Sequence, residues 1–220
     1  KANNEKYSLL LICRHSIPMI HNQISQDYKD NDEMDNYRSE KNLKLGLEKL
    51  AKIRLLSLDV DGVLTDGGIY YDDKGNTFRK FNAQDGMGLV RLQKSGLHVT
   101  VISAGSPGAI ELRARRLGID HVFTDVSDKL STLKTLADKL DLEMQYIAHM
   151  GDDVNDLSLM QAVGTAIASA NAVPEIIAAA DIVTTRSGGN GAVREICDTI
   201  IQMRGDKLET NHKFNKHKID

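Results

Sequence analysis

The segment Ile53–Thr65, IRLLSLDVDGVLT, carries the strongest structural signal in this 220-residue chain. Its largely apolar first half predicts a β-strand that is buried on both faces, as strands of a parallel sheet are. Ligands of open α/β sheets bind just beyond the carboxyl ends of such strands. Asp59 and Asp61 follow the apolar run directly. The sequence therefore brings a pair of carboxylates to the mouth of a predicted site.

The spacing of the two aspartates allows both carboxylates to converge on one small volume. Like charges repel strongly there unless a cation or a proton intervenes. Mg²⁺ suits the pair, because it takes oxygen ligands and uses one or two carboxylates together with a substrate phosphate. In such a site Asp59 would attack phosphorus, and Asp61 would protonate the leaving oxygen and later deprotonate a water. An acidic turn that ends in Gly is also common, so a structural interpretation stays open.

Two further segments each place a polar residue near a predicted helix start. The β-branched strand Leu97–Ile102 ends at Ser103, whose hydroxyl, with nearby backbone amides, is suited to hold a phosphate. An ordinary helix cap is the alternative for a lone serine. Lys129 opens an amphipathic run, where a cation opposes the helix macrodipole. A bound phosphate would supply the countercharge that this lysine lacks.

The last predicted strand ends at Met150 and leads into Gly-Asp-Asp-Val-Asn-Asp and another helix. Carboxylates at this strand end would complete a cation site with the first pair. We predict Asp152 as the metal ligand, and Asp153 and Asp156 as supporting residues, with Asp156 orienting Lys129 or the loop. Acids also cap helix starts favourably, and we expect one of the three to do only that.

In this order, the four segments resemble the haloacid dehalogenase superfamily of phosphohydrolases with an aspartate nucleophile. The closer match is to the capless subclass that contains 3-deoxy-D-manno-octulosonate 8-phosphate phosphatase and its nonulosonate 9-phosphate relative. It covers roughly residues 53–203 and rests on Gly68–Tyr71, Lys80–Asn82, Asp85-Gly86-x-Gly88, Ser127-x-Lys129 and Gly188–Glu195.

This resemblance implies a Mg²⁺-dependent phosphatase that acts on a phosphorylated acidic sugar, in the cytoplasm and in lipopolysaccharide biosynthesis. The reaction would pass through an aspartyl phosphate on Asp59. The magnesium ligands would be the Asp59 carboxylate, the Asp61 backbone carbonyl and Asp152. The phosphate would be held by Ser103, Ala104 and Lys129.

One departure from the family pattern concerns the substrate. The family usually follows the second-strand Ser or Thr with Gly-Arg, whose arginine helps to hold the sugar-acid carboxylate. Here the corresponding pair is Ala104-Gly105, and no basic side chain replaces the arginine locally. The carboxylate would then be bound from elsewhere, or the sugar differs, with a nonulosonate 9-phosphate as the alternative. The candidate binding residues are Lys80, Arg186 and Arg194.

Motif spacing predicts an α/β fold: a Rossmann-like, mostly parallel sheet with helices on both faces and a β-hairpin flap. Only about forty residues separate the first two motif strands, and a hairpin at Ile69–Phe81 and a helix at Gly88–Lys94 take much of them, so no cap domain fits. A site without a lid is wet. The resemblance implies a homotetramer in which a neighbour's hairpin and its segment Gly188–Arg194 cover each site.

Composition argues against other classes of partner. The net charge is −3, tryptophan is absent and no basic stripe with interleaved aromatics appears, so we expect no nucleic acid partner. The apolar stretch Leu9–Cys13 is too short to cross a membrane. Cys13 and Cys197 show no ligand spacing, and we expect them to be reduced, as in the cytosol.

The flanks are harder to interpret than the centre. We divide the chain into a poorly defined extension at 1–50, a phosphatase domain at 51–203 and a mobile polar tail at 204–220. The extension is strongly polar and expected to be disordered or loosely helical, apart from a short helix at Leu43–Leu50. A chain that begins at Lys1 is consistent with a fragment or a processed product.

A rival hypothesis is a non-catalytic oligomerisation module. The carboxyl-terminal domain of some sialic-acid-activating cytidylyltransferases resembles the same subclass but has lost catalytic acids. The acids are present here, which favours the enzyme. A mutase or phosphonatase would need a cap that the spacing excludes.

Overall fold

The computed structural model describes residues 44–205, and the expectations for residues 1–43 and 206–220 lie outside this range. Within it, six strands form one parallel sheet in the order β5-β4-β1-β6-β7-β8. The strands are β1 Leu55–Leu58, β4 His98–Ile102, β5 His121–Phe123, β6 Ile147–Gly151, β7 Thr165–Ala168 and β8 Ile182–Val183. The predicted α/β fold class is thereby confirmed.

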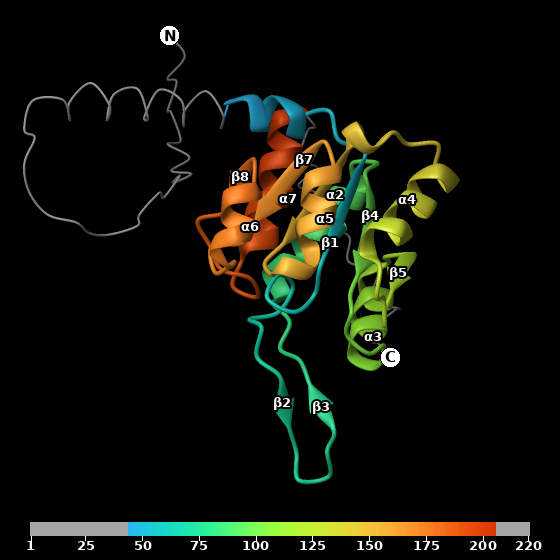
Figure 1. Cartoon of the computed structure of the whole chain (residues 1–220), viewed down its shortest axis with the longest axis vertical. Helices are drawn as coiled ribbons and strands as arrows, with labels where there is room; N and C mark the ends of the chain where they lie inside the picture. The colour runs from blue at the N-terminus through green and yellow to red at the C-terminus, as the bar shows by residue number, and fades with distance from the viewer. Residues whose placement is uncertain (1–43, 206–220) are drawn as a thin grey trace, which may run out of the picture.

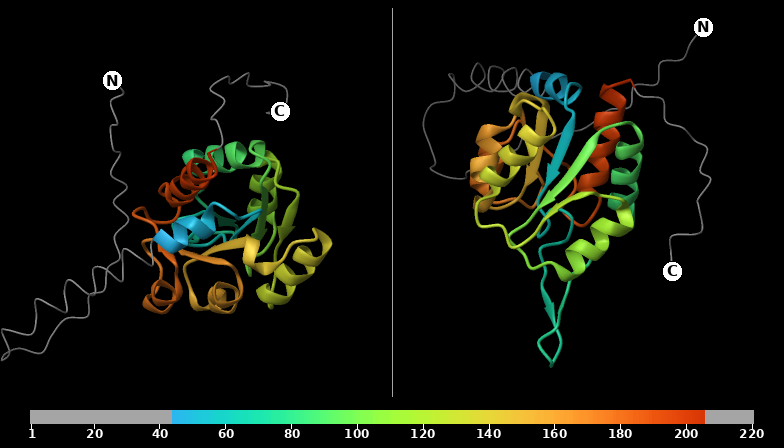
Figure 2. Two further views of the ribbon diagram at one scale, coloured as in Figure 1. Left: turned by 90° about the horizontal axis from the view of Figure 1, so that it is seen from above. Right: turned by 90° about the vertical axis from the view of Figure 1, so that its right-hand side faces the viewer.

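Helices cover both faces of the sheet (Figure 2). Their bounds are α2 Ala83–Lys94, α3 Gly108–Leu117, α4 Lys129–Lys139, α5 Leu157–Ala162, α6 Pro174–Ala179 and α7 Ala192–Met203, with 3₁₀ turns η1 Met144–Tyr146 and η2 Val154–Asp156. A further helix runs through 44–50. Successive side chains of β1 point to opposite faces of the sheet and so join two hydrophobic cores. Leu56 and Leu58 pack with α2, α3 and α7, whereas Leu55 packs with α4.

The helix α2 begins earlier than predicted. Asn82 caps it by accepting hydrogen bonds from the amides of Gln84 and Asp85. The predicted helix began at Gly88, and the structure adds the turn from Ala83, although Gly86 and Gly88 lower helix propensity. In the structure these glycines allow close packing, since a Cβ at Gly88 would press on Arg194 of α7.

A β-hairpin projects away from the sheet, from the end where the site lies (Figure 1). Its strands are β2 Tyr70–Tyr71 and β3 Thr77–Phe78, paired antiparallel, and a bridge between Thr65 and Phe81 closes its base. Between β1 and β4 the described residues hold this hairpin and α2, and no separate cap domain. The hairpin flap is therefore present, although its paired strands are shorter than the predicted segment.

The chain order of the strands defines where a ligand binds. From β1 the chain moves outward to β4 and β5, then crosses back to β6 on the other side of β1. In open α/β sheets, the crevice for a ligand forms at the carboxyl ends of the strands where the direction reverses. That place lies between the ends of β1 and β6, next to the end of β4.

Candidate active site

Asp59 follows the last residue of β1 and lies at the bottom of the crevice. Its backbone N–H donates to the Met150 carbonyl at 3.0 Å, which continues the parallel ladder between β1 and β6 past the end of the strand. The residue is only 4 % exposed. Burial raises the pKa of Asp59 to about 6, with the nearby Asp156 carboxylate adding to the rise and Lys129 opposing it.

Lys129 bridges two carboxylates from its place at the start of α4. Its Nζ lies 3.0 Å from Asp59 Oδ1 and 2.7 Å from Asp156 Oδ1, and its side chain is 3 % exposed. Burial by itself lowers the pKa of the ammonium, but the two carboxylates outweigh burial and raise it. The unfavourable position at a helix start is thus offset by two acids of the chain itself.

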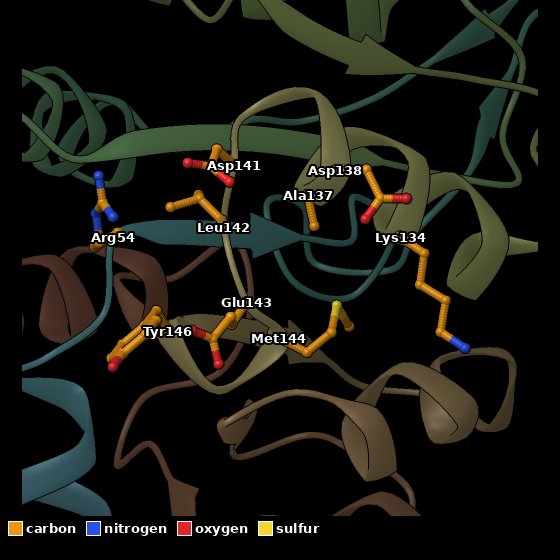
Figure 3. Close-up of a pocket in the computed structure, with 9 residues that line it drawn as sticks. All are labelled: Arg54, Lys134, Ala137, Asp138, Asp141, Leu142, Glu143, Met144 and Tyr146. Carbon is orange, nitrogen blue, oxygen red and sulfur yellow. The ribbon is translucent and has the colours of Figure 1, made fainter.

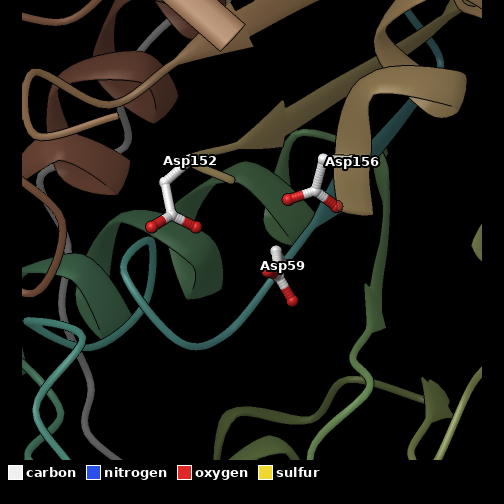
Figure 4. Close-up of side chains that lie close together, drawn as sticks. All are labelled: Asp59, Asp152 and Asp156. Carbon is white, nitrogen blue, oxygen red and sulfur yellow. The ribbon is translucent and has the colours of Figure 1, made fainter. Parts of the chain in front are cut away.

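Three carboxylates gather around one space, from Asp59, Asp152 and Asp156 (Figure 4). One oxygen from each lies within 4.8 Å of the others. Burial, together with Asp59 and Asp156, raises the pKa of Asp152 to about 7. For Asp156 the effect of burial is overcome by the hydrogen bonds and charges of His149 and Lys129, which lower its pKa to about 2. The single positive charge of Lys129 cannot neutralise three ionised carboxylates.

The cluster fits a magnesium ion. Asp152 Oδ1 and Asp156 Oδ2 are buried, and neither has a hydrogen-bond partner among the described residues. Buried carboxylate oxygens are costly without a partner. A small cation with oxygen ligands supplies the missing charge and a direct partner for Asp152 Oδ1, and the waters that Mg²⁺ keeps supply donors for Asp156 Oδ2.

Gly62 makes room for Asp152. It has a φ of +86°, which favours glycine, and a Cβ on it would overlap the Asp152 carboxylate. Its carbonyl accepts hydrogen bonds from Ser169 Oγ at 3.2 Å and Asn171 Nδ2 at 3.1 Å. Gly188 packs against the same carbonyl. The glycine segment after residue 187 therefore supports the site loop of its own chain.

The Asp61 carboxylate lines the pocket and is not one of the three carboxylates that gather around the shared space. It accepts two hydrogen bonds from Arg79, Nε to Oδ1 at 2.8 Å and Nη2 to Oδ2 at 3.1 Å. Sequence reasoning missed Arg79 and selected its neighbour, Lys80. The signal was available, because adjacent residues of an extended strand point in opposite directions.

A pocket of about 210 Å³ opens over these groups. Ser103 lies at its wall and is 1 % exposed; its Oγ accepts the Gly105 N–H at 3.0 Å and keeps its own proton to donate. Helix α3 begins only at Gly108, so Ser103 lies in the preceding turn and not at the helix start. The pocket is lined by Asp59, Asp61, Gly67, Ser103, Ala104, Gly105, Asp152, Asp153 and Asn155.

His149 was also missed. It lies in β6 in register with Ser57 of β1, and its Nδ1 is 3.0 Å from Ser57 Oγ. Its Nε2 is 3.1 Å from Asp156 Oδ1. The residue is fully buried. A histidine within a buried strand was the available signal, and its side chain contacts Asp156, which follows the strand in η2.

The remaining predicted residues lie around the site or beyond it. Asp153 accepts the Val154 N–H at 2.7 Å and so caps η2. The candidate carboxylate-binding side chains do not line the pocket. Lys80 is 64 % exposed and pairs with Asp66, and Arg194 pairs with Asp198. Arg186 is exposed beside the glycine segment.

A larger cavity, of about 710 Å³, lies at the opposite edge of the sheet (Figure 3). Arg54 and Tyr146, which immediately precede β1 and β6, belong to its lining. It therefore opens at the amino ends of the strands, away from the acids. Its mixed charges show no arrangement for chemistry.

The fold and the site together define a class: an α/β phosphohydrolase with an acidic metal centre at the carboxyl edge of its sheet. The model of haloacid dehalogenase-like hydrolases matches residues 119–196. The 3-deoxy-D-manno-octulosonate 8-phosphate phosphatase KdsC of Escherichia coli K12 is 40% identical over 72% of this chain and 85% of that relative. KdsC of Yersinia pestis is 40% identical over 74% of this chain and 87% of that relative. This chain belongs to the haloacid dehalogenase-like hydrolases.

Solved structures agree with this placement. The 3-deoxy-D-manno-octulosonate 8-phosphate phosphatase of Moraxella catarrhalis, in complex with magnesium, phosphate and KDO, superimposes with a TM-score of 0.71. It is 39% identical, covering 72% of this chain and 92% of that one. The cobalt-bound phosphatase of Haemophilus influenzae gives a TM-score of 0.69 at 35% identity, over 71% and 92% of the two chains.

The chain is thus a phosphatase that acts on a sugar phosphate and uses Mg²⁺. The catalytic reading is confirmed over the non-catalytic module. Among residues 44–205, no helix is both long and apolar enough to cross a membrane.

Proposed function

We propose that this chain hydrolyses the phosphate monoester of an acidic sugar through an aspartyl phosphate on Asp59. The sugar is 3-deoxy-D-manno-octulosonate 8-phosphate, with a nonulosonate 9-phosphate as the second candidate. The observation that carries the proposal is the buried contact of Asp59 with Lys129, at 3.0 Å, beneath a pocket that Asp61 and Ser103 also line. This set holds a nucleophile, a cation for the phosphate oxygens and a proton donor at the entrance.

In the first step an Asp59 oxygen attacks phosphorus, and the bond from phosphorus to the sugar oxygen breaks. Asp61 gives its proton to that oxygen, so that the sugar leaves as an alcohol. Lys129 and the Ser103 hydroxyl, with the Ala104 amide, hold the phosphoryl oxygens. Positive charge and donors that are fixed before reaction are worth most where water is excluded.

In the second step a water attacks phosphorus, and the bond to Asp59 breaks. Asp61 accepts a proton from that water and so returns to its starting protonation state. Inorganic phosphate leaves, and the nucleophile is restored. The same carboxyl group therefore serves both halves of the reaction.

The residues that would hold Mg²⁺ are Asp59, Asp152 and the backbone carbonyl of Asp61. Bound there, the ion neutralises charge on the carboxylates and the transferring phosphoryl group. Asp156, which touches both Lys129 and His149, would fix the lysine rather than ligate the metal.

Recognition of the sugar acid is proposed to involve basic residues at the rim. The Moraxella relative holds KDO, whose carboxylate needs a cationic partner. Within one chain Lys80, Arg186 and Arg194 stand outside the pocket, so they would act only in an assembly or after a shift of the hairpin.

Self-association is proposed to complete the site. The hairpin exposes apolar side chains at its surface, at 48% to 69% of their area: Ile69, Tyr70, Tyr71 and Phe78. Such a patch on a projecting element favours a protein contact. A homotetramer in which a neighbour's hairpin and glycine segment cover the pocket fits this exposure. We place the enzyme in the cytoplasm, in the supply of sugar acid for lipopolysaccharide.

The test is a panel of sugar phosphates assayed with and without Mg²⁺. It contains 3-deoxy-D-manno-octulosonate 8-phosphate, a nonulosonate 9-phosphate, and neutral hexose 6-phosphates as controls. We expect kcat/KM for an acidic sugar to exceed that for the neutral sugars at least about tenfold, and chelation of the metal to abolish turnover. Equal rates on neutral sugars would refute the proposed substrate class.

A further inference from the structure

Arg79 forms the one bidentate arginine–carboxylate contact that we find at the mouth of the described pocket. It binds both oxygens of Asp61. The arginine side chain is only 7 % exposed, whereas that of Asp61 is 30 % exposed. The carboxylate is thus reached from solvent on one side and fixed from the protein side by a fork of two N–H donors.

Gly105 lies against this pair. A Cβ on it would be 2.8 Å from Arg79 Nη2 and 3.2 Å from Asp61 Oδ2. Its φ is not in the left-handed region, so the backbone does not require glycine here. Space is the remaining reason, because any side chain at this position would displace the guanidinium.

We infer that Arg79 is the positioning residue of Asp61. Because Gly105 has no side chain, it leaves room for the Arg79 guanidinium to reach the Asp61 carboxylate. This inference rests on the proposed role of Asp61 in proton transfer. It links two features of the sequence that are far apart: a missing side chain at 105 and a cation at 79.

The geometry explains how positioning would work. An ionised carboxylate has about four lone-pair directions, and the fork uses one on each oxygen. Each oxygen keeps another direction for the leaving oxygen or the attacking water. A misplacement of about 1 Å costs on the order of 10²-fold in rate, so fixing the rotation of Asp61 has a large effect.

The neighbouring ion pair of Lys80 with Asp66 serves as a comparison, because it is exposed to solvent. Lys80 reaches Asp66 with a single contact of 3.1 Å, and the lysine is 64 % exposed. Exposed pairs of this kind contribute little. Arg79 differs from it in burial, in its two bonds and in the catalytic position of its partner.

The experiment compares two esters in the Mg²⁺-loaded enzyme. 3-Deoxy-D-manno-octulosonate 8-phosphate releases an alkoxide that needs a proton, whereas p-nitrophenyl phosphate releases a phenolate that does not. For Arg79→Met we expect the pre-steady-state rate of the first, ester-cleaving step to fall about 10²-fold for the sugar ester, with KM within about threefold, and less than about threefold for the aryl ester. The second step, in which Asp61 takes a proton from water, should slow equally for both. Equal losses for both esters in the first step, or a rise in KM alone, would overturn the inference.

Asp61→Asn separates this inference from the function it rests on. If Asp61→Asn leaves the first-step rate on the aryl ester unchanged but lowers that on the sugar ester, the role of Asp61 in proton transfer stands. An Arg79→Met variant that then lowers both first-step rates equally refutes the positioning role of Arg79 alone. If Asp61→Asn shows no difference between esters in that step, the proposed role of Asp61 fails.

Gly105→Ala provides a second route that leaves the hairpin intact. Its methyl would push aside the flexible end of Arg79, so we expect the same ester dependence, with no further loss in the double variant Gly105→Ala, Arg79→Met. Arg79→Lys should regain only part of the rate, because an ammonium lacks the fork. The control is Arg91→Met, which breaks a pair with Asp198 between α2 and α7 and should leave both rates unchanged. Additive losses in the double variant would contradict the coupling.

Discussion

Lys129 Nζ lies 3.0 Å from Asp59 Oδ1, and the two side chains are 3 % and 6 % exposed. A buried cation therefore touches the proposed nucleophile before any substrate arrives. The same ammonium also binds Asp156, which His149 holds from the other side. This chain of contacts fixes the position at which a transferring phosphate would meet positive charge.

Lys129→Met should lose both stability and rate. Removing one partner of a buried ion pair costs about 3–5 kcal/mol, because the other charge stays buried and uncompensated. We expect kcat to fall on the order of 10²-fold or more, as for other fixed donors at developing charge. Chemical denaturation and steady-state kinetics measure the two effects. Lys134→Met, on the exposed face of the same helix, is the control. A Lys129→Met variant with the wild-type kcat would contradict the role of Lys129 in holding the phosphoryl group.

Gly62→Ala should weaken the metal site. The position needs a positive φ and has no room for a Cβ beside Asp152, so the cost exceeds the roughly 1–3 kcal/mol of backbone strain alone. Gly75→Ala is a matched control, because Gly75 also has a positive φ, at +81°, but nothing lies within 4 Å of its Cβ position. We expect only the first variant to require more Mg²⁺ for half-maximal activity. Equal Mg²⁺ requirements would show that the close approach to Asp152 is unimportant.

Mg²⁺ should stabilise the fold more at high pH than at low pH. The folded-state pKa values of Asp59 and Asp152, about 6 and about 7, lie above the ordinary 3.8. The metal-free folded state therefore binds protons that the unfolded chain releases. The contribution of these two groups to the free energy of unfolding is fully present below about pH 4 and is lost as the pH rises through about 6 to 7. Bound metal replaces those protons.

Thermal unfolding with and without Mg²⁺ measures this dependence. We expect the rise in Tm on adding Mg²⁺ to be several degrees at about pH 8.5 and to vanish near pH 5. Asp152→Asn should lose most of the rise at high pH. A rise in Tm of the same size at both pH values would disagree with the proposed ligands.

How much of this could be predicted from the sequence depends on the kind of signal. Strand ends and motif order indicated the fold, and they brought Asp59 and Asp152 to one edge, because continuous apolar runs and carboxyl-terminal turns are local patterns. The start of α2 was missed, since Gly86 and Gly88 serve packing against α3 and α7 rather than helix propensity.

The missed site residues depend on pairing between distant segments. His149 contacts Ser57, and the register between β1 and β6 places these two residues side by side. Arg79 reaches Asp61 because the returning arm of the hairpin brings it beside the site loop, and the space at Gly105 becomes visible only in three dimensions. The local pattern can single out these residues, but it does not identify the partner that each of them contacts.

The exposed hairpin should control assembly. Tyr71→Ser together with Phe78→Ser removes much of the exposed apolar surface of the hairpin. These residues pack against little within one chain, so the chain should still fold, and a fall in Tm would reflect the lost assembly. Sedimentation or light scattering should show the wild type as a tetramer and the double variant as a smaller species with reduced kcat/KM. A fully active wild-type monomer would refute the proposed assembly. Lys74→Gln, at the hairpin tip, serves as a charge-changing comparison.

The nucleophile can be observed chemically. Asp61→Asn should still accept phosphate from p-nitrophenyl phosphate but hydrolyse the aspartyl phosphate slowly, because no carboxylate takes the proton from water. Borohydride reduces such an acyl phosphate to homoserine, which mass spectrometry assigns to a position. Asp59→Asn should remain folded and lose about 10⁴-fold or more in kcat. The most direct test is therefore borohydride trapping in the Mg²⁺-loaded Asp61→Asn variant: homoserine at position 59, in step with the burst of nitrophenol, is the predicted result, and a nitrophenol burst with residue 59 unmodified would contradict the account.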